Sequence, residues 1–226
     1  RKTRIMSHER IPKAPNLVLP GVDYLVGNED QFRNQLRLYF NQLDDANQSL
    51  YGTIGGYHVD FPHISIYSAA NQYATGNNTP TKILWTATDD VQGFTLNADN
   101  TITALENGTY KIEYRLQGKN TDNTSSHNAV VWMQVEGADL VNSATEFTIP
   151  AAKSAVIPAF NALTGFITWE AIAGQKIALY WATEQAYATS GPVNGVYLDY
   201  EAAQTSPYAH PAIPSAYGVI QYIGRD

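Results

Sequence analysis

Short stretches in which apolar and polar residues alternate, each ended by a turn signal, fill the chain from residue 63 to residue 226. The clearest alternation is in residues 109–116 (TYKIEYRL), where every second residue from Tyr110 onward is apolar. A period of two places successive side chains on opposite faces, as in a β-strand with one buried face. Hairpin signals such as ENG at 106–108 and AG at 173–174 separate the stretches. This pattern predicts a mainly β, antiparallel fold over 63–226, either a sandwich or a jelly roll.

Composition agrees with that fold class. Charged residues make up 15% of the 226 residues and tyrosine occurs 15 times, which favours sheets over helices. No βαβ rhythm is present, so nucleotide-binding α/β folds are excluded. The expected strands are 63–68, 81–86, 93–96, 101–105, 109–117, 129–136, 144–149, 162–170, 176–182, 195–202 and 215–223.

One helix is predicted, over residues 29–51, with Asn28 as its N-cap. Its apolar residues recur in alternate steps of four and three, which is the spacing of a coiled-coil seam. A helix packed on a sheet of its own chain explains the same spacing, so both interpretations stay open. A glycine-rich linker, 52–62, follows it. The residues of the seam are Phe32, Leu36, Tyr39, Leu43 and Leu50.

An extended arm is predicted for residues 1–28, because its prolines are incompatible with a helix. The arm is too apolar for a solvated linker, so we expect it to anchor on another surface, either that of a second protein or that of its own domain. The residues expected to anchor it are Ile11, Pro12, Pro15, Leu17, Val18, Leu19, Pro20 and Tyr24.

Several functional classes are excluded by charge and composition. The net charge of −7 comes without a basic stripe, which argues against nucleic-acid binding, and no apolar stretch reaches the ~18 residues of a membrane span. Cysteine is absent, so thiolate metal sites and disulfides are unavailable. His58, Asp60 and His63 lack zinc-site spacing, although in a trimer one histidine near the axis would become three. We expect no bound metal and no cofactor.

No catalytic constellation is recognised. The chain has neither a Gly-x-Ser-x-Gly elbow nor a phosphate-binding glycine loop. Asp89 and Asp90 are adjacent and cannot face each other across a sugar; they are interpreted as solvated turn residues. Asp99 and Asp122 stand in fragments similar to calcium loops but lack the regular spacing. The chain is therefore expected not to be an enzyme.

A sugar-binding platform is the remaining candidate site. Tyr180, Trp181 and Tyr187 lie in or near the segment EQAYATSGPVNG. One of Tyr180 and Trp181 is expected in the core, because neighbouring strand residues point to opposite faces. Tyr187 is the best exposed candidate for binding a glycan.

Two parts of the chain resemble known families. Residues 10–43 (RIPKAPNLVLPGVDYLVGNEDQFRNQLRLYFNQL) resemble the N-terminal segment of structural proteins of tailed bacteriophages, with Val18 where that pattern has a proline. Residues 64–226 resemble the phage version of the complement-component and tumour-necrosis-factor jelly roll. The motifs that carry this second likeness are NTPT at 78–81 before Trp85, NGTY at 107–110, AGQ at 173–175 before LYW at 179–181, and HPAIPS at 210–215.

The resemblance implies a homotrimer with the helix seam at its axis, and a non-enzymatic role in a virion assembled in the host bacterial cytoplasm. The expected function is a trimeric head decoration, cement or head-fibre protein whose arm binds the major capsid or a tail protein. The alternative is a tail-fibre or tail-tip protein that recognises host surface glycans.

Overall fold

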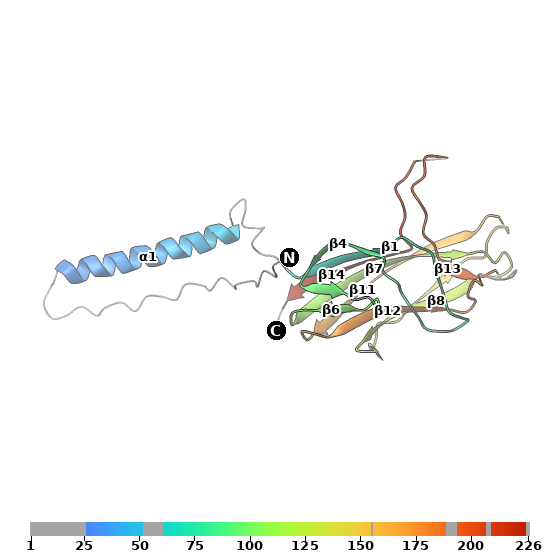
Figure 1. The fold of residues 1–226 in the computed structure, drawn as a ribbon, viewed down its shortest axis with the longest axis horizontal. Coiled ribbons are helices and arrows are strands. Elements are labelled where there is room, and N and C mark those ends of the chain that lie inside the picture. Colours follow the sequence, from blue (N-terminus) through green and yellow to red (C-terminus); the bar gives the residue numbers. More distant parts are fainter. Residues whose placement is uncertain (1–25, 52–60, 155, 189–193, 207–208, 225–226) are drawn as a thin grey trace. The chain divides into compact units, whose positions relative to one another are not determined.

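The chain is described by a computed structural model that covers residues 26–51, 61–154, 156–188, 194–206 and 209–224. Its contacts divide the chain into two units, Arg1–Asp60 and Phe61–Asp226. Within the described residues the first unit contributes one helix, and the second contains all of the strands (Figure 1).

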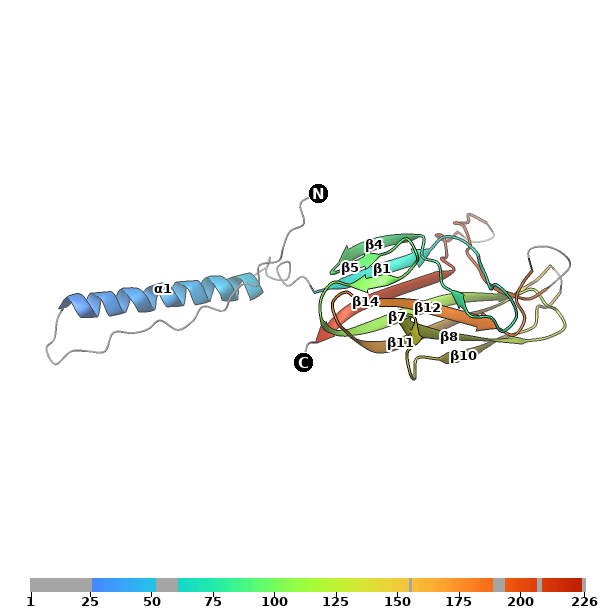
Figure 2. The ribbon, with the colours of Figure 1, turned by 60° about the horizontal axis from the view of Figure 1, so that its bottom comes forward.

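The strands form two antiparallel sheets (Figure 2). Sheet A is centred on β7, which pairs with β11 along its whole length and with β14 and β13 on its other edge. Beyond β14 the sheet continues through β1 to β4, and beyond β13 it continues to β2. The members of sheet A are β1 (His63–Ser68), β2 (Gln72–Tyr73), β4 (Ala87–Gln92), β7 (Gly108–Asn120), β11 (Ala159–Ala171), β13 (Val196–Leu198) and β14 (Ala216–Gly224).

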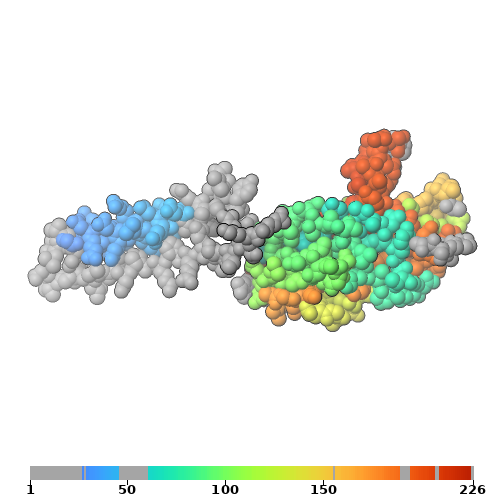
Figure 3. All heavy atoms as spheres, in the orientation of Figure 1, coloured from blue at the N-terminus to red at the C-terminus, as the bar shows by residue number. Residues whose placement is uncertain are grey.

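Sheet B is centred on β12, which pairs with β8, β6 and β3, while β10 and β5 lie further out. A segment between β13 and β14 forms a hairpin that projects from the sandwich (orange-red in Figure 3), with bridges between Glu201 and Ile213 and between Gln204 and His210. The members of sheet B are β3 (Thr81–Lys82), β5 (Phe94–Leu96), β6 (Ile102–Ala104), β8 (His127–Val135), β9 (Ala138–Asp139), β10 (Thr145–Ile149) and β12 (Lys176–Thr183).

The predicted fold class is confirmed, because the chain is mainly β with antiparallel sheets in a jelly-roll arrangement and a single described helix. The residues that alternate in the sequence lie on opposite faces of each sheet. On β7, Tyr110, Ile112, Tyr114 and Leu116 are buried, while the residues between them face outward. The predicted Pro-rich arm lies outside the described residues.

The strand predicted at 81–86 ends at Lys82. The amide of Ile83 still donates to the carbonyl oxygen of Leu179 on β12, but the next two amides donate to side chains. The amide of Leu84 donates to Oε1 of Gln72 at 2.7 Å, and that of Trp85 donates to Oδ1 of Asn100 at 2.7 Å. Sequence patterns do not show such distant side-chain acceptors.

Asp89 and Asp90 were interpreted as turn residues, and this was wrong. Both lie on β4, an exposed edge strand that pairs only with β1, where the register shifts by one residue. The strand lacks a buried face, so it carries no alternating pattern. Charged side chains on such an edge oppose pairing with other chains.

The helix α1 (Val26–Tyr51) begins three residues before the predicted start. Asn28 therefore lies within the helix and is not its N-cap. Glu29, in the first turn, pairs with Arg33 one turn later at 2.5 Å, which adds to the stability of this end of the helix.

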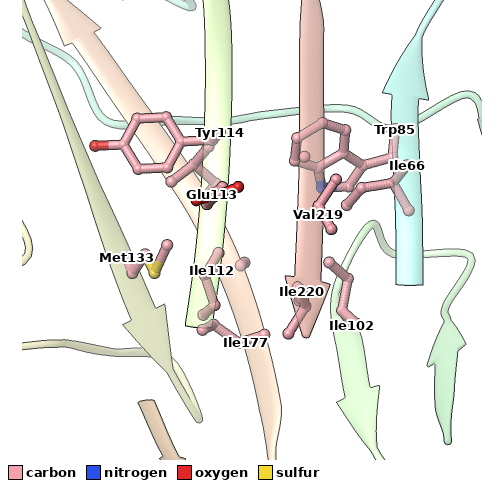
Figure 4. A pocket seen from close by; sticks show the side chains of 13 residues that line it. Ile66, Trp85, Ile102, Ile112, Glu113, Tyr114, Met133, Ile177, Val219 and Ile220 are labelled. Atoms are coloured by element: carbon pink, nitrogen blue, oxygen red, sulfur yellow. The ribbon is translucent and has the colours of Figure 1, made fainter. Parts of the chain in front are cut away.

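The core lies between the two sheets and is apolar. Trp181, Ile64 and Ile83 are fully buried within it. Figure 4 shows side chains that line a small cavity between the sheets, among them Ile112 and Met133. The volume of the cavity is about 20 Å³, which leaves room for about one water molecule. The sandwich is therefore close-packed, and its interior offers no ligand-sized space at this point.

Gly165 on β11 faces Tyr114 on β7 and leaves room for the tyrosine ring. A Cβ at position 165 would lie 2.5 Å from Cζ of that ring, so replacing Gly165 with alanine forces the ring from its buried position. We predict that Gly165→Ala lowers the free energy of unfolding by about 1–3 kcal/mol in denaturant titrations.

Gly224→Ala is the matched control, because a Cβ there meets nothing within 4 Å. Its effect should stay within about 0.5 kcal/mol. Equal effects of the two substitutions would contradict the packing of Tyr114 on Gly165.

Candidate functional site

The arm residues Ile11, Pro12, Pro15, Leu17, Val18, Leu19, Pro20 and Tyr24 lie outside the described part of the chain, as do His58 and Asp60. The structure describes three candidate interaction surfaces: the apolar stripe of α1, the outer face of sheet A and the outer face of sheet B.

The stripe of α1 is incompletely covered. Phe32 is exposed, and Leu36, Tyr39 and Leu43 are half-buried, while the side chain of Leu50 is not described. Leu38 and Phe40 are also exposed, by 60% and 54%. A helix with this much accessible apolar surface is poorly stable unless a partner covers it.

The outer face of sheet A carries a strip without charge along β11, the edge strand. The strip consists of the exposed residues Phe160, Ala162, Thr164, Phe166 and Thr168. Phe166 is 73% exposed and Phe160 is 50% exposed. Edge strands of monomeric proteins usually carry charged side chains that oppose pairing, so this strip is a candidate contact surface.

Charged residues of β7 line this strip on one side. Lys111 pairs with Glu113, and its Nζ lies 5.5 Å from the centre of the Phe166 ring. Lys119 lies directly opposite Phe160 in the register, with its Nζ 5.2 Å from that ring centre. The aromatic rings of β11 therefore have cations beside them, as in many protein interfaces that combine apolar and charged contacts.

Lys119 belongs to a cross-strand row with Tyr197 on β13 and Tyr73 on β2. Its ammonium group lies 3.2 Å from Oδ1 of the buried Asp199. Burial acts to lower the pKa of Lys119, but hydrogen bonding with Tyr197 and the charge of Asp199 outweigh it, so that the pKa is raised. The lysine therefore stays protonated and holds this end of the face together.

Tyr187, the predicted glycan-binding residue, lies at this end of sheet A. Its ring centre is 5.6 Å from that of Tyr73 and 5.1 Å from that of Tyr197. Tyr187 is half-buried, whereas Tyr73 is 38% exposed. Of the other two aromatic candidates, Trp181 is fully buried and Tyr180 lies on the outer face of sheet B.

The acidic loop residues act as local hydrogen-bond acceptors. Asp99 accepts from the amide and hydroxyl groups of Thr101 at 3.1 and 2.6 Å. Asp122 accepts from the amide and hydroxyl groups of Thr124 at 2.8 and 2.6 Å, and Nε2 of His127 lies 2.9 Å from its other oxygen. No group of three histidine, aspartate or glutamate side chains within the described ranges could hold a metal ion.

Sequence reasoning missed the strip on β11, although it predicted the strand. The signal was present: the positions that alternate with Leu163, Ile167 and Trp169 hold only phenylalanine, alanine and threonine from 160 to 168. Uncharged residues on both faces of an edge strand indicate a second contact surface.

Solved structures were found that are similar to this chain in structure. No family model and no curated protein matches the sequence. Among solved structures, Eiger TNF from S. frugiperda is 9% identical, with a TM-score of 0.45 over 74% of this chain and 94% of that one. Murine APRIL is 13% identical, with a TM-score of 0.41 over 72% and 99%. Among the helical residues that the structure describes, no segment is long and apolar enough to span a membrane.

The hydrogen bonds of Asp122 make the stability of its loop depend on pH. The Thr124 hydroxyl and amide groups, together with His127, lower the pKa of Asp122 from 3.8 to about 2. The carboxylate therefore stabilises the fold above pH 3.8, and this stabilisation is lost as the pH falls from 3.8 through 2. We predict that the gap in unfolding free energy between the natural chain and Asp122→Asn narrows over that range in denaturant titrations.

Thr124→Ala should reduce the pH-dependent part of the unfolding free energy, because it removes the hydroxyl group that donates to Asp122. A gap for Asp122→Asn that stays constant down to pH 2 would contradict the assignment.

Proposed function

We propose that the chain is a non-enzymatic, homotrimeric surface protein of a tailed-phage virion, specifically a head decoration, cement or head-fibre protein. In this proposal the arm at 1–28 anchors the trimer on the major capsid or a tail protein, and α1 forms the trimer stem. The single observation that carries the proposal is that two apolar surfaces, the stripe of α1 and the strip on β11, are both incompletely covered.

The helix supports self-association by its length and pattern. The 26 residues of α1 extend ~39 Å along the helix axis, and this length is sufficient for several layers of contacts in a coiled-coil seam. Phe32, Leu36, Tyr39 and Leu43 follow coiled-coil spacing, and a second and third copy supply the same residues to cover them. A partner of different sequence would need its own matching seam, so other copies of this chain are the simplest occupants.

The strip on β11 supports the same conclusion independently of the helix. Ala162 and Thr164 are small, which lets another backbone approach, while Phe160 and Phe166 offer large apolar groups at either side. Lys111, Glu113 and Arg115 beside the strip carry both signs of charge, as a surface that meets copies of itself requires.

The virion assignment draws on the resemblance of residues 10–43 to phage structural proteins and on the order of the motifs in 64–226. The absence of cysteine from the sequence suits assembly in a reducing bacterial cytoplasm.

A second candidate function is a tail-fibre or tail-tip protein that binds host surface glycans. The observation that favours it is the stacking of Tyr187 on the exposed ring of Tyr73, since exposed tyrosine rings pack against sugars.

Self-association is tested by sedimentation equilibrium of the full chain. We predict a mass about three times the 24.9 kDa of one chain. The double variant Leu36→Asp/Leu43→Asp should weaken association at least about tenfold, because it places charges in the seam.

Asn34→Asp/Asn41→Asp adds the same two charges at exposed positions outside the seam and is the matched control; it should leave the mass unchanged. A monomeric natural chain, or equal loss of association in both double variants, would overturn the proposed stem.

The location is tested by cross-linking purified virions and identifying the cross-linked peptides by mass spectrometry. The proposal predicts links from the arm to the major capsid protein. Links to tail-tip proteins alone would favour the second candidate function.

A further inference from the structure

Two aromatic residues lie side by side on the outer face of sheet B, which faces away from the core and from sheet A. Tyr180 on β12 is directly opposite Trp132 on β8 and also opposite Lys82 on β3. The two ring centres are 6.0 Å apart with planes 26° from parallel. Both aromatic side chains are half-buried, so part of each ring reaches solvent.

Trp132 differs from every other tryptophan of the chain. The sequence has four tryptophans, and Trp85, Trp169 and Trp181 are at most 8% exposed and belong to the core. Trp132 points to the opposite face and contributes nothing to that core. Trp132 is therefore the tryptophan that a ligand on the outer face of sheet B can contact.

Trp132 is also held in a fixed orientation. Its Nε1 donates to Oδ1 of Asp139 at 2.8 Å, and Nε2 of Gln134 donates to the same oxygen at 2.9 Å. Asp139 and Gln134 thus set the ring in place before any ligand arrives, which lowers the entropic cost of binding. They also place a carboxylate and an amide at the rim of the ring, where hydroxyl groups could be bound.

A polar group also lies beside Tyr180, at the other end of the aromatic pair from Asp139. Nζ of Lys82 lies 5.9 Å from the centre of the Tyr180 ring and donates to the carbonyl oxygen of Asp99 at 3.1 Å. On β12 the outward neighbours of Tyr180 are Ala178 and Ala182, so small side chains flank the ring along the strand.

From this arrangement we infer that the strip formed by Lys82, Trp132, Gln134, Asp139 and Tyr180 is a binding site for a neutral oligosaccharide. A pyranose ring has an apolar C–H face, which packs on indole and phenol rings, and a hydroxylated edge, which needs carboxylate, amide and ammonium partners. The strip supplies both kinds of group from four strands, β3, β12, β8 and β9.

Charge favours a neutral sugar over other occupants. The strip holds one lysine and one aspartate, so the two charges balance, while the whole chain carries −7. A nucleic acid or an acidic polysaccharide would be repelled by that net charge. The inference takes its ligand class from the second candidate function but assigns a different site, on the sheet that the proposed trimer contacts leave open.

The test is a titration of the full chain, labelled with ¹⁵N, with four neutral oligosaccharides: maltoheptaose, cellohexaose, laminarihexaose and chitohexaose. The four indole N–H signals report on the four tryptophans separately. We expect at least one sugar to shift the signal of Trp132 while the three core tryptophans stay unchanged. Tyr180→Ala should weaken that binding about tenfold or more, and Tyr180→Phe, which keeps the ring, should preserve it within about threefold.

Tyr67→Ala is the matched control, since it removes a half-buried tyrosine of β1 that belongs to neither sugar site. It should leave the affinity unchanged. Loss of binding in Tyr73→Ala but not in Tyr180→Ala would overturn the inference and support the site at Tyr187 instead. Absence of a Trp132 shift with all four sugars would also overturn it, while leaving the trimeric virion role intact.

Thermal unfolding of each variant, followed by circular dichroism, separates a lost site from a lost fold. If Tyr180→Ala unfolds at a markedly lower temperature, Trp132→Phe serves as the second variant, since it keeps an aromatic ring but removes the donor to Asp139. Isothermal titration calorimetry measures its affinity, because the substitution also removes the indole signal. Unchanged affinity in folded Tyr180→Ala and Trp132→Phe together would contradict the assigned site.

Discussion

The pairing of β7 with β11 over thirteen residues is the contact on which the sandwich depends. It gives sheet A its longest continuous ladder, and the pleat of both strands then decides which side chain enters the core and which faces outward. Tyr110, Ile112 and Tyr114 go inward from β7, and the ring of Tyr114 covers Gly165 on the partner strand. Because the inward positions are fixed by a period of two, the outward positions are equally fixed, and the uncharged strip on β11 follows from the same alternation.

The two outer faces of the sandwich differ in chemistry. On sheet A, β11 presents phenylalanine, alanine and threonine without charge, next to the charged residues of β7. On sheet B, Trp132 and Tyr180 form a small aromatic pair between polar groups that are already hydrogen-bonded. The first face suits broad contact with another copy of the chain, and the second suits a small polar ligand. A division of this kind lets a protein assemble through one sheet and remain open on the other.

Sequence alone predicted the fold class and most strands, because alternation and turn residues are local signals. It missed β4, because the residues of this strand have no buried face. It also extended the strand at 81–86 too far, because the side chains of Gln72 and Asn100 accept hydrogen bonds from the amides of Leu84 and Trp85 in place of a neighbouring strand. It named Tyr180 and Trp181 together but could not say which was outside. The partner of Tyr180, Trp132, lies 48 positions earlier in the chain and meets it only through the register of β8 and β12.

In the proposed trimer the outer face of sheet A meets other copies of the chain, while the outer face of sheet B stays open. Hydroxyl-radical footprinting of the full chain, at concentrations above and below its association range, tests this directly. We expect Phe160 and Phe166 to become protected on association, whereas Trp132 and Tyr180 should react equally at both concentrations. Protection of Trp132 and Tyr180 with unchanged reactivity of Phe166 would contradict this arrangement.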